Sequence, residues 1–360
     1  MPINIALTAF DVCMLFAVIG LLACWLAVLP RAEGGTMESG LLHFLGVAVA
    51  LLTLSSAGIL ISRVLELDGG SWSQVPAALP LALKVTHYGH VWVWRIPALL
   101  LLWLAWGWSF RHRHHTWAAW LMVVAAAGIA LTRSETGHPA DHGDFTFAVW
   151  ADWVHLLSAA IWVGSLFGMS LAIFPKLLRA GESAGEHSAE IFQRLSTLSG
   201  VALAVILASG IYTAIGQLGS FSALWTSSYG MTLDVKLFIV LLMIMFGAHN
   251  RYIKLPRLLR LAGKPVPRPL FGKLLRGFVC TDRAGGALTE VRSCARAVLI
   301  ESLLGVAVIA AASVLLHGMP PAEMPKNMPG MSMPMQMSRA ASPAGAPLSF
   351  ASLPAKLSEC

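Results

Sequence analysis

"NIALTAFDVCMLFAVIGLLACWLAVL", residues 4–29, decides the fold class of this chain. The stretch contains 26 residues, and Asp11 is its one charged residue. A helix crosses the hydrocarbon core of a bilayer with about 20 mostly apolar residues. The stretch is too long for the apolar region of a cleavable signal peptide, and no basic segment precedes it. We therefore interpret it as a membrane-spanning helix.

Seven further stretches have the same character. The predicted spans cover residues 4–29, 41–62, 91–110, 117–132, 148–174, 197–216, 231–250 and 297–316. Of the 360 residues, 57% are hydrophobic and 12% are charged, whereas soluble domains carry about 25% charged residues. The sequence therefore predicts an all-α, polytopic membrane helix bundle of about eight transmembrane helices. We expect an N-terminal four-helix half (1–133), a C-terminal four-helix half (134–318) and a tail without stable structure (319–360).

The Lys and Arg residues predict the orientation of the bundle. The loops after the first, third, fifth and seventh spans hold 17 of the 25 Lys and Arg residues, and positive loops favour the cytoplasmic side. Both termini are then expected outside, which is the periplasm in a Gram-negative host, and the chain is a multi-pass inner-membrane protein. The lipid bilayer explains the net charge of +7 better than nucleic acid does, because no nucleic-acid-binding signature is present.

The C-terminal tail is rich in methionine. Seven of the 15 methionines lie within 19 residues: Met319, Met324, Met328, Met331, Met333, Met335 and Met337. Thioethers are soft, uncharged ligands that suit Cu(I), and they form no disulfides in an oxidising compartment. The tail therefore predicts copper binding outside the membrane. The alternative interpretation is a linker that is enriched in methionine by chance.

Histidines and carboxylates are concentrated on the same predicted side. The candidate ligands there are His87, His90, His138, His142, His155 and His317. His87 and His90 share a helical face at spacing i, i+3. Imidazole binds copper in either common oxidation state, so Cu(II) is also a candidate at these positions. Each histidine could instead be an interfacial, hydrogen-bonded side chain.

Several ionisable residues lie within the predicted spans, where they are costly and often functional. Asp152 and His155 are one turn apart, so they either pair with each other or extend an outer metal site into the membrane. Glu301, Asp234 and Asp11 are further intramembrane polar candidates. Snorkelling of the side chain explains those near helix ends equally well.

Four segments of the C-terminal half together resemble the copper resistance protein D (CopD) family of bacterial inner-membrane proteins. They are "DWVHLLSAAIWVGSLF" (152–167), "FQRLSTLSGVALAVILASGIYTA" (192–214), "SSYGMTLDVKLFIVLLMIMFGAHNRYIKLP" (227–256) and "ARAVLIESLLGVAVIAAASVLLHGMPP" (295–321). In the N-terminal half, "THYGHVWVWRIP" (86–97) fits best. The resemblance implies functional roles for His138, Asp152 and His155, and weaker ones for Tyr212, Asn250 and Glu301.

The resemblance also implies a function. The family is expected to bind copper at the periplasmic face and to move it across the inner membrane, with a small periplasmic CopC-like copper-binding protein as partner. We expect no enzymatic activity. No ATPase motif is present, and a cation moving inward gains about 2.3 kcal/mol per charge per 100 mV, so import is favoured.

Two other functions remain open from the sequence. The chain could be a haem-binding or redox membrane protein, with His43 and His249 or with His155 as axial ligands. It could also be a copper sensor or scaffold that binds the ion without transporting it.

Overall fold

The computed structural model describes residues 2–30, 34–67, 72–112, 116–141, 143–181, 185–266 and 286–323. These residues form helices and connections, and no strand occurs among them. The elements are α1 (Pro2–Ala23), η1 (Cys24–Val28), α2 (Gly34–Leu67), α3 (Val75–Val85), α4 (His87–Arg111), α5 (Thr116–Ser134), η3 (His138–Ala140), α6 (Phe147–Gly168), η4 (Met169–Ile173), α7 (Phe174–Ala180), α8 (Gly185–Leu218), α9 (Ala223–Thr226), α10 (Ser228–His249), η6 (Asn250–Lys254), α11 (Leu255–Leu261), α13 (Ala287–Leu316) and η8 (Pro321–Glu323).

Within the described ranges, eight helical segments are long and apolar enough to cross a membrane. They are Ile3–Val28, Met37–Leu67, His87–Arg111, Thr116–Ser134, Phe147–Ala180, His187–Leu218, Ser228–Leu261 and Ala287–Glu323. The predicted all-α membrane bundle is confirmed. Each predicted span lies largely inside one of these segments, and α3 is a shorter apolar helix that the sequence interpretation left out. The division into two four-helix halves stays a prediction.

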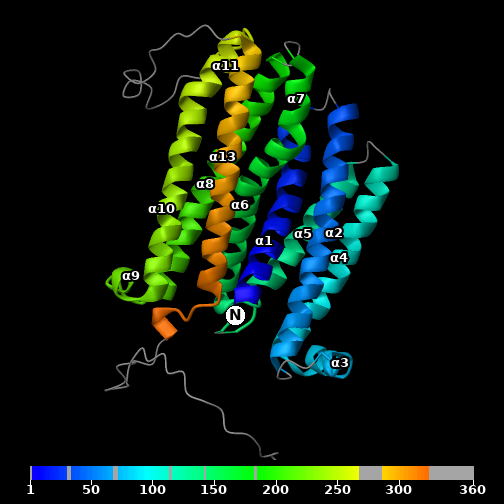
Figure 1. Cartoon of the computed structure of the whole chain (residues 1–360), viewed down its shortest axis with the longest axis vertical. Helices are drawn as coiled ribbons and strands as arrows, with labels where there is room; N and C mark the ends of the chain where they lie inside the picture. The colour runs from blue at the N-terminus through cyan, green and yellow to red at the C-terminus, as the bar shows by residue number, and fades with distance from the viewer. Residues whose placement is uncertain are drawn as a thin grey trace, which may run out of the picture. The chain divides into compact units, whose positions relative to one another are not determined.

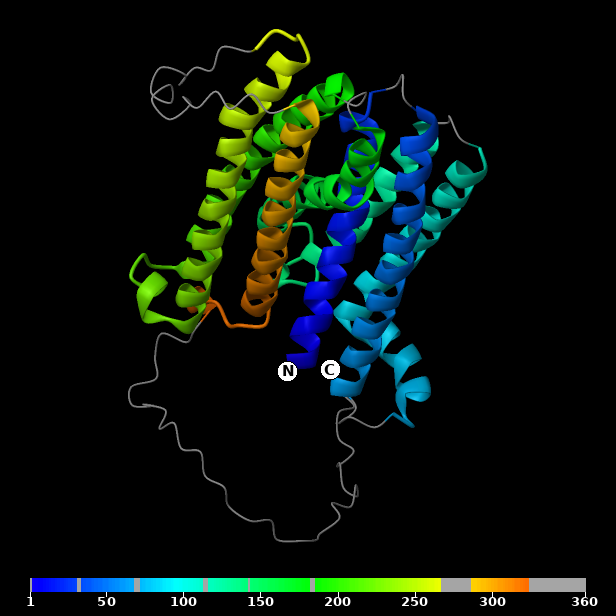
Figure 2. The same ribbon diagram turned by 45° about the horizontal axis from the view of Figure 1, so that its top comes forward.

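The helices run roughly alongside one another (Figures 1 and 2). The two ends of the bundle differ in the basic residues that the sequence places there. We call the end with α7 and α11 the basic end; its described basic residues are Arg111, Lys176, Arg179, Arg194, Arg251, Lys254, Arg257, Arg260, Lys264, Arg292 and Arg296. The opposite end, which we call the distal end, carries the N-terminus, α3 and α9. The start of α4 and the loop before α6 also lie there.

Three helices begin at the distal end with side-chain caps. The hydroxyls of Thr86, Thr146 and Ser227 accept hydrogen bonds from the backbone N–H groups of the residues three positions later. Such caps satisfy N–H groups that have no partner inside the helix. They fix where α4, α6 and α10 start, and so they position the polar residues of the first two turns of these helices.

Helices α1 and α6 pack closely against each other near the middle of the bundle. A Cβ atom on Gly20 would lie 1.8 Å from the backbone carbon of Gly164, and one on Gly164 would lie 1.9 Å from the carbonyl oxygen of Phe16. Gly164 and Gly168 form a GxxxG pair, the spacing that lets two membrane helices approach at their backbones. This contact joins α6, which carries Asp152 and His155, to the N-terminal helix.

Candidate metal centre

The loop before α6 has a defined conformation at the distal end. The Glu135 carboxylate accepts a hydrogen bond from the backbone N–H of Phe145 at 3.1 Å, and Phe145 has a φ of 54°. Burial raises the pKa of the Glu135 carboxyl above its ordinary value; the Asp144 charge raises it further, and the Phe145 N–H opposes the shift. His87 Nε2 lies 2.7 Å from an Asp144 carboxylate oxygen, so the start of α4 is tied to the loop.

Three candidate ligands meet at this loop. His138 Nδ1 lies 3.2 Å from an Asp141 carboxylate oxygen and 3.8 Å from a Glu323 carboxylate oxygen. One ligand atom from each of the three residues lies within 4.8 Å of the others, and among the described residues no other group of three or more His, Cys, Asp or Glu does so. His138 Nε2 is buried without a hydrogen-bond partner. The arrangement offers one imidazole and two carboxylates to a cation.

The other histidines predicted on this side do not join that group. His90 bonds the Lys84 carbonyl oxygen at 2.9 Å, and His317 bonds the Ser313 carbonyl oxygen at 2.8 Å. His87 bonds Asp144 instead of sharing a partner with His90. His142 lies outside the described residues.

His155 is hydrogen-bonded to α8, where the Ile206 backbone and the Ser209 hydroxyl are its partners. Its Nδ1 lies 3.1 Å from Ser209 Oγ on α8, and the Ser209 hydroxyl donates to the Val205 carbonyl oxygen at 2.7 Å. Because the hydroxyl proton is used in that bond, Nδ1–H is the donor to Ser209 and the lone pair lies on Nε2. A neutral imidazole in this tautomer can accept a soft metal ion at Nε2.

Among the described residues His155 bonds Ser209 and not Asp152, so of the two alternatives for this pair the mutual hydrogen bond is not formed. Asp152 instead lies within electrostatic reach of Lys236 on α10 and of Arg133 on α5, and Lys236 also acts on His155. These groups occupy the distal third of the bundle. His155 therefore lies close to one carboxylate and two basic side chains.

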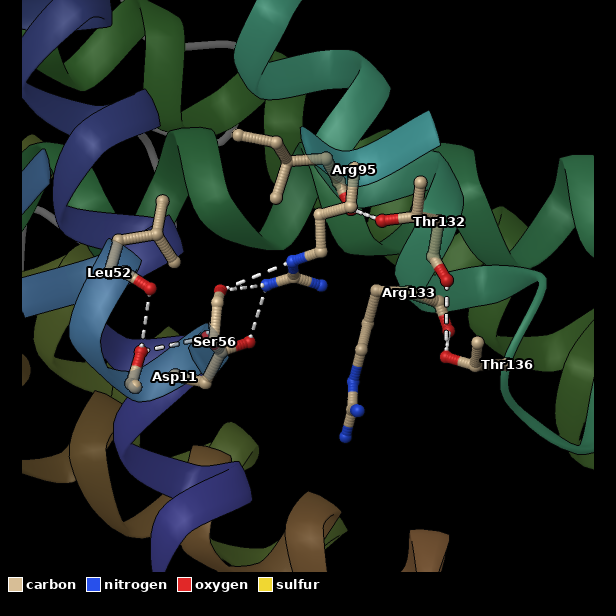
Figure 3. A network of polar contacts seen from close by, with 9 residues as sticks. Asp11, Leu52, Ser56, Arg95, Thr132, Arg133 and Thr136 are labelled. Atoms are coloured by element: carbon tan, nitrogen blue, oxygen red, sulfur yellow. Dashed lines mark hydrogen bonds and ion pairs between the residues drawn. The ribbon is translucent and has the colours of Figure 1, made fainter. Parts of the chain in front are cut away.

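A second polar network fills the neighbouring part of the N-terminal half (Figure 3). Asp11 Oδ1 accepts from the hydroxyls of Ser55 and Ser56 at 2.8 and 2.9 Å, and Asp11 Oδ2 accepts from Arg95 Nη2 at 2.8 Å. Asp11 and Arg95 are both buried. Asp11 is thus held by an ion pair and hydrogen bonds, and its carboxylate connects α1 to α2 and α4. Arg133 extends beside the network, and its Nη2 is buried without a partner.

The remaining polar candidates lie apart from these groups. Glu301 is buried toward the basic end, where the Asn250 amide donates to its carboxylate. Asp234 and Tyr212 are exposed, and the Tyr212 ring contacts Phe147 edge to face. Met319 is exposed, and the other tail methionines lie outside the described residues: Met324, Met328, Met331, Met333, Met335 and Met337.

Comparison with known proteins assigns the family. The model "Copper resistance protein D" matches residues 189–315, and the model "Copper resistance protein D-like, N-terminal domain" matches residues 1–146. The chain belongs to the copper resistance protein D family. The matched ranges of this CopD-family chain include α1, α4, α10 and most of α8 and α13. They therefore include Asp11, His138 and Glu301.

Three relatives are similar over slightly more than half of the chain. They are "Copper transport protein CutJ" of Bacillus subtilis (27% identical), "Copper resistance protein D" of Pseudomonas syringae pv. tomato (29%) and "Inner membrane protein YebZ" of Escherichia coli (24%). The aligned regions cover 55%, 57% and 58% of this chain, and 38%, 66% and 70% of the respective relatives. No solved structure matches the chain. The chain is thus a multi-pass membrane protein of the copper resistance protein D family.

Sequence reasoning missed several residues of these networks. Glu323 completes the His138 group but follows the last span, where a single carboxylate carries no signal. Arg95 and Arg133 carry a signal that could have been used, because a charged residue inside a span is rare and usually has a partner. Ser209 gives no signal of its own, since serine is common in membrane helices.

Proposed function

We propose that this CopD-family chain captures copper at the distal end and passes it through its C-terminal half toward the basic end. The observation that carries the proposal is the convergence of His138, Asp141 and Glu323 from two segments far apart in the sequence. Two carboxylates and an imidazole suit Cu(II) or a partly hydrated ion, whereas the methionines of the tail suit Cu(I). The two kinds of ligand would then serve the two oxidation states.

We propose that the copper ion is next transferred to His155. Its Nε2 carries the lone pair, and the residue lies about two helical turns beyond the start of α6. Asp152, one turn closer to the distal end, offers a carboxylate that lowers the cost of a cation entering the membrane. The ion would move from the carboxylate-rich group at the surface to an imidazole inside the bundle.

The proposed direction is import into the cytoplasm. The basic end would face the cytoplasm by the positive-inside rule, so that the distal end, both termini and the tail are periplasmic. The membrane potential then drives a cation inward without an ATPase motif. A small CopC-like periplasmic protein would deliver copper to the distal end. Labelling of an engineered cysteine in the tail from outside intact cells tests this orientation, and labelling only after lysis contradicts it.

Copper uptake into proteoliposomes that contain a trapped Cu(I) chelator tests transport. We expect wild type to load the chelator at least tenfold faster than His155→Ala or His138→Ala. His43→Ala is the matched control, because His43 lies on α2 and bonds its own helix at the Ser39 carbonyl oxygen. Equal uptake by wild type and His155→Ala would contradict transport. If the wild-type protein binds copper and shows no uptake, the alternative function as a copper sensor or scaffold would be favoured.

Truncation after Glu323 separates the tail from the His138 group. The truncated chain keeps Glu323 and loses the six methionines from Met324 to Met337. We expect the amount of Cu(I) bound per protein to fall while uptake at saturating copper continues. Complete loss of uptake would place the tail within the transport route itself.

Of the two ligand sets of the haem alternative, the His43 and His249 pair receives little support, and His155 with an outer partner stays open. His43 lies on α2 and His249 on α10, and these helices stand on opposite sides of the bundle in both views (Figures 1 and 2). One haem cannot be ligated from both. An absorption spectrum of the purified protein tests this directly, because bound haem would give a Soret band.

A further inference from the structure

A groove of about 650 Å³ lies toward the basic end, away from the proposed copper residues. It runs between α8 and α10, and residues of α6 and α13 also line it. Its surface is mostly apolar, with Trp162, Phe192 and Ile244 among the walls. Helices α8 and α10 are the least buried of the candidate spans, so the groove opens toward the bilayer. Its volume falls in the range of organic ligands and is far too large for a bare ion.

The polar groups of the groove have unused acceptors. The Asn250 amide donates to one Glu301 oxygen, while Asn250 Oδ1 is buried and has no partner. Asn250 is 6% exposed and Glu301 is 3% exposed. Gly247 has no side chain to cover the second Glu301 oxygen, which lies 3.8 Å from where a Cβ atom would stand. A buried carboxylate and a buried amide oxygen both require a donor, and a positive donor suits the pair best.

A cationic side chain lies at the rim of the same groove. Arg251 is exposed, and its Nη1 donates to the carbonyl oxygen and the hydroxyl of Ser196 at 2.7 and 3.2 Å. These bonds hold the guanidinium against α8 and leave its other N–H groups available to an anion. Lys254 does not fill the Asn250–Glu301 pair, because its Nζ donates to the Ser293 carbonyl oxygen at 2.7 Å.

The backbone turn that carries Asn250 and Arg251 is unusual. Both residues belong to the π-helical turn η6, which follows α10. Such π turns occur frequently at functional sites. Because α10 has 22 residues, Asn250 lies about 33 Å from its start, close to the thickness of the hydrocarbon core. The polar groups of the groove are therefore at the level of lipid headgroups.

We propose that this groove binds an aminophospholipid of the phosphatidylethanolamine type from the leaflet at the basic end. The ammonium would donate to Asn250 Oδ1 and to the Glu301 carboxylate, and the phosphate would accept from Arg251. The acyl chains would follow the apolar walls out into the bilayer. This occupant gives Asn250 Oδ1 a donor, places a hydrogen-bonding cation beside the Glu301 carboxylate and buries its acyl chains against the apolar walls.

The test compares phospholipids with identical acyl chains on the purified, metal-free full-length protein. After delipidation, the protein is exchanged into detergent with equal amounts of phosphatidylethanolamine, phosphatidylcholine and phosphatidylglycerol, and the lipid retained is measured by native mass spectrometry. We expect phosphatidylethanolamine to be retained at least tenfold more than phosphatidylcholine, whose ammonium has no N–H donor. Equal retention of these two lipids would overturn the proposal. The assay contains no copper, so its outcome is independent of the transport proposal.

Variants assign the binding to the groove. Glu301→Gln is expected to lower the preference for phosphatidylethanolamine over phosphatidylcholine at least tenfold. Arg251→Gln is expected to lower the retention of all three phospholipids to the same degree. Glu190→Gln is the matched control, because Glu190 lies on α8 near the basic end but pairs with Arg194 outside the groove. An unchanged preference in Glu301→Gln would overturn the proposal. If that variant fails to fold, the comparison of phosphatidylethanolamine with phosphatidylcholine on the wild-type protein still tests the proposal.

Discussion

Arg95 on α4 and Asp11 on α1 form an ion pair inside the membrane-spanning bundle, with 2.8 Å between Nη2 and Oδ2. Both side chains are almost fully buried, at 5% and 1% exposed. Ser55 and Ser56 on α2 complete the hydrogen bonds of the carboxylate (Figure 3). Three helices of the N-terminal half therefore depend on one set of polar contacts. Because neither charge can be hydrated in this position, loss of one partner leaves the other uncompensated.

Asp11→Ala is expected to destabilise the protein by about 3–5 kcal/mol, the cost of breaking a buried pair by removing one partner. The double variant Asp11→Leu with Arg95→Met should recover much of that loss, because no unpaired charge remains. The exposed pair Arg63 and Glu66 is the control, and Glu66→Ala is expected to cost at most about 1 kcal/mol. Unfolding of each purified variant in mixed micelles measures the change in the free energy of unfolding. Equal destabilisation by Asp11→Ala and Glu66→Ala would contradict the structural role of Asp11.

Gly164→Ala is expected to separate α1 from α6. An added methyl group would meet the Phe16 carbonyl oxygen at 1.9 Å, so the helix backbones must move apart, at a cost of about 1–3 kcal/mol or more. Gly107→Ala is the control, since nothing lies within 4 Å of its added Cβ atom and alanine favours the helix by up to about 1 kcal/mol. Melting temperatures of the two variants should move in opposite directions. A tolerated Gly164→Ala would show that the close approach of these helices is unnecessary.

Ser209→Ala is expected to weaken copper binding at His155 about 10–100-fold, because the partner of a ligand's second nitrogen fixes its tautomer and orientation. The alanine variant leaves Nδ1–H without Ser209 Oγ, so the imidazole can turn or change tautomer. Thr213→Ala, one turn further along α8, removes a hydroxyl that bonds the Ser209 carbonyl oxygen and serves as control. Competition with a Cu(I) chelator measures the affinity. Equal affinities of the two variants would indicate that Ser209 does not orient a copper ligand.

Glu135→Gln is expected to change how stability depends on pH. The pKa of Glu135 is raised in the folded protein, mainly by burial, above the unfolded value of about 4.3. Folding therefore favours the protonated form, and the stability that this group contributes at low pH is lost as the pH rises through the folded pKa. Glutamine keeps the acceptor for the Phe145 N–H and removes the titration. Melting temperatures between pH 4 and 8 test this, and parallel curves for wild type and variant would contradict it.

The group of His138, Asp141 and Glu323 was only partly predictable. The spacing of His138 and Asp141 within one short loop is visible in the sequence, but their meeting with Glu323 is not. That contact requires the end of α13 to return to the loop before α6, which depends on how α6 and α13 pack. His87 and His90 show the opposite case, because they share a helical face and still bond different partners.

The sequence by itself determined the number of spans, the all-α class, the charge difference between the two ends and the candidate soft ligands. These properties depend on the length of apolar runs and on which residues lie next to one another. Only the tertiary structure decided that Glu323 joins His138, that Ser209 selects the tautomer of His155, that Gly20 meets Gly164 and that Asn250 faces a groove beside Glu301. The reason is physical: helices that are apolar on every side can be rotated in a bilayer at little cost, so close packing between them selects the faces that meet.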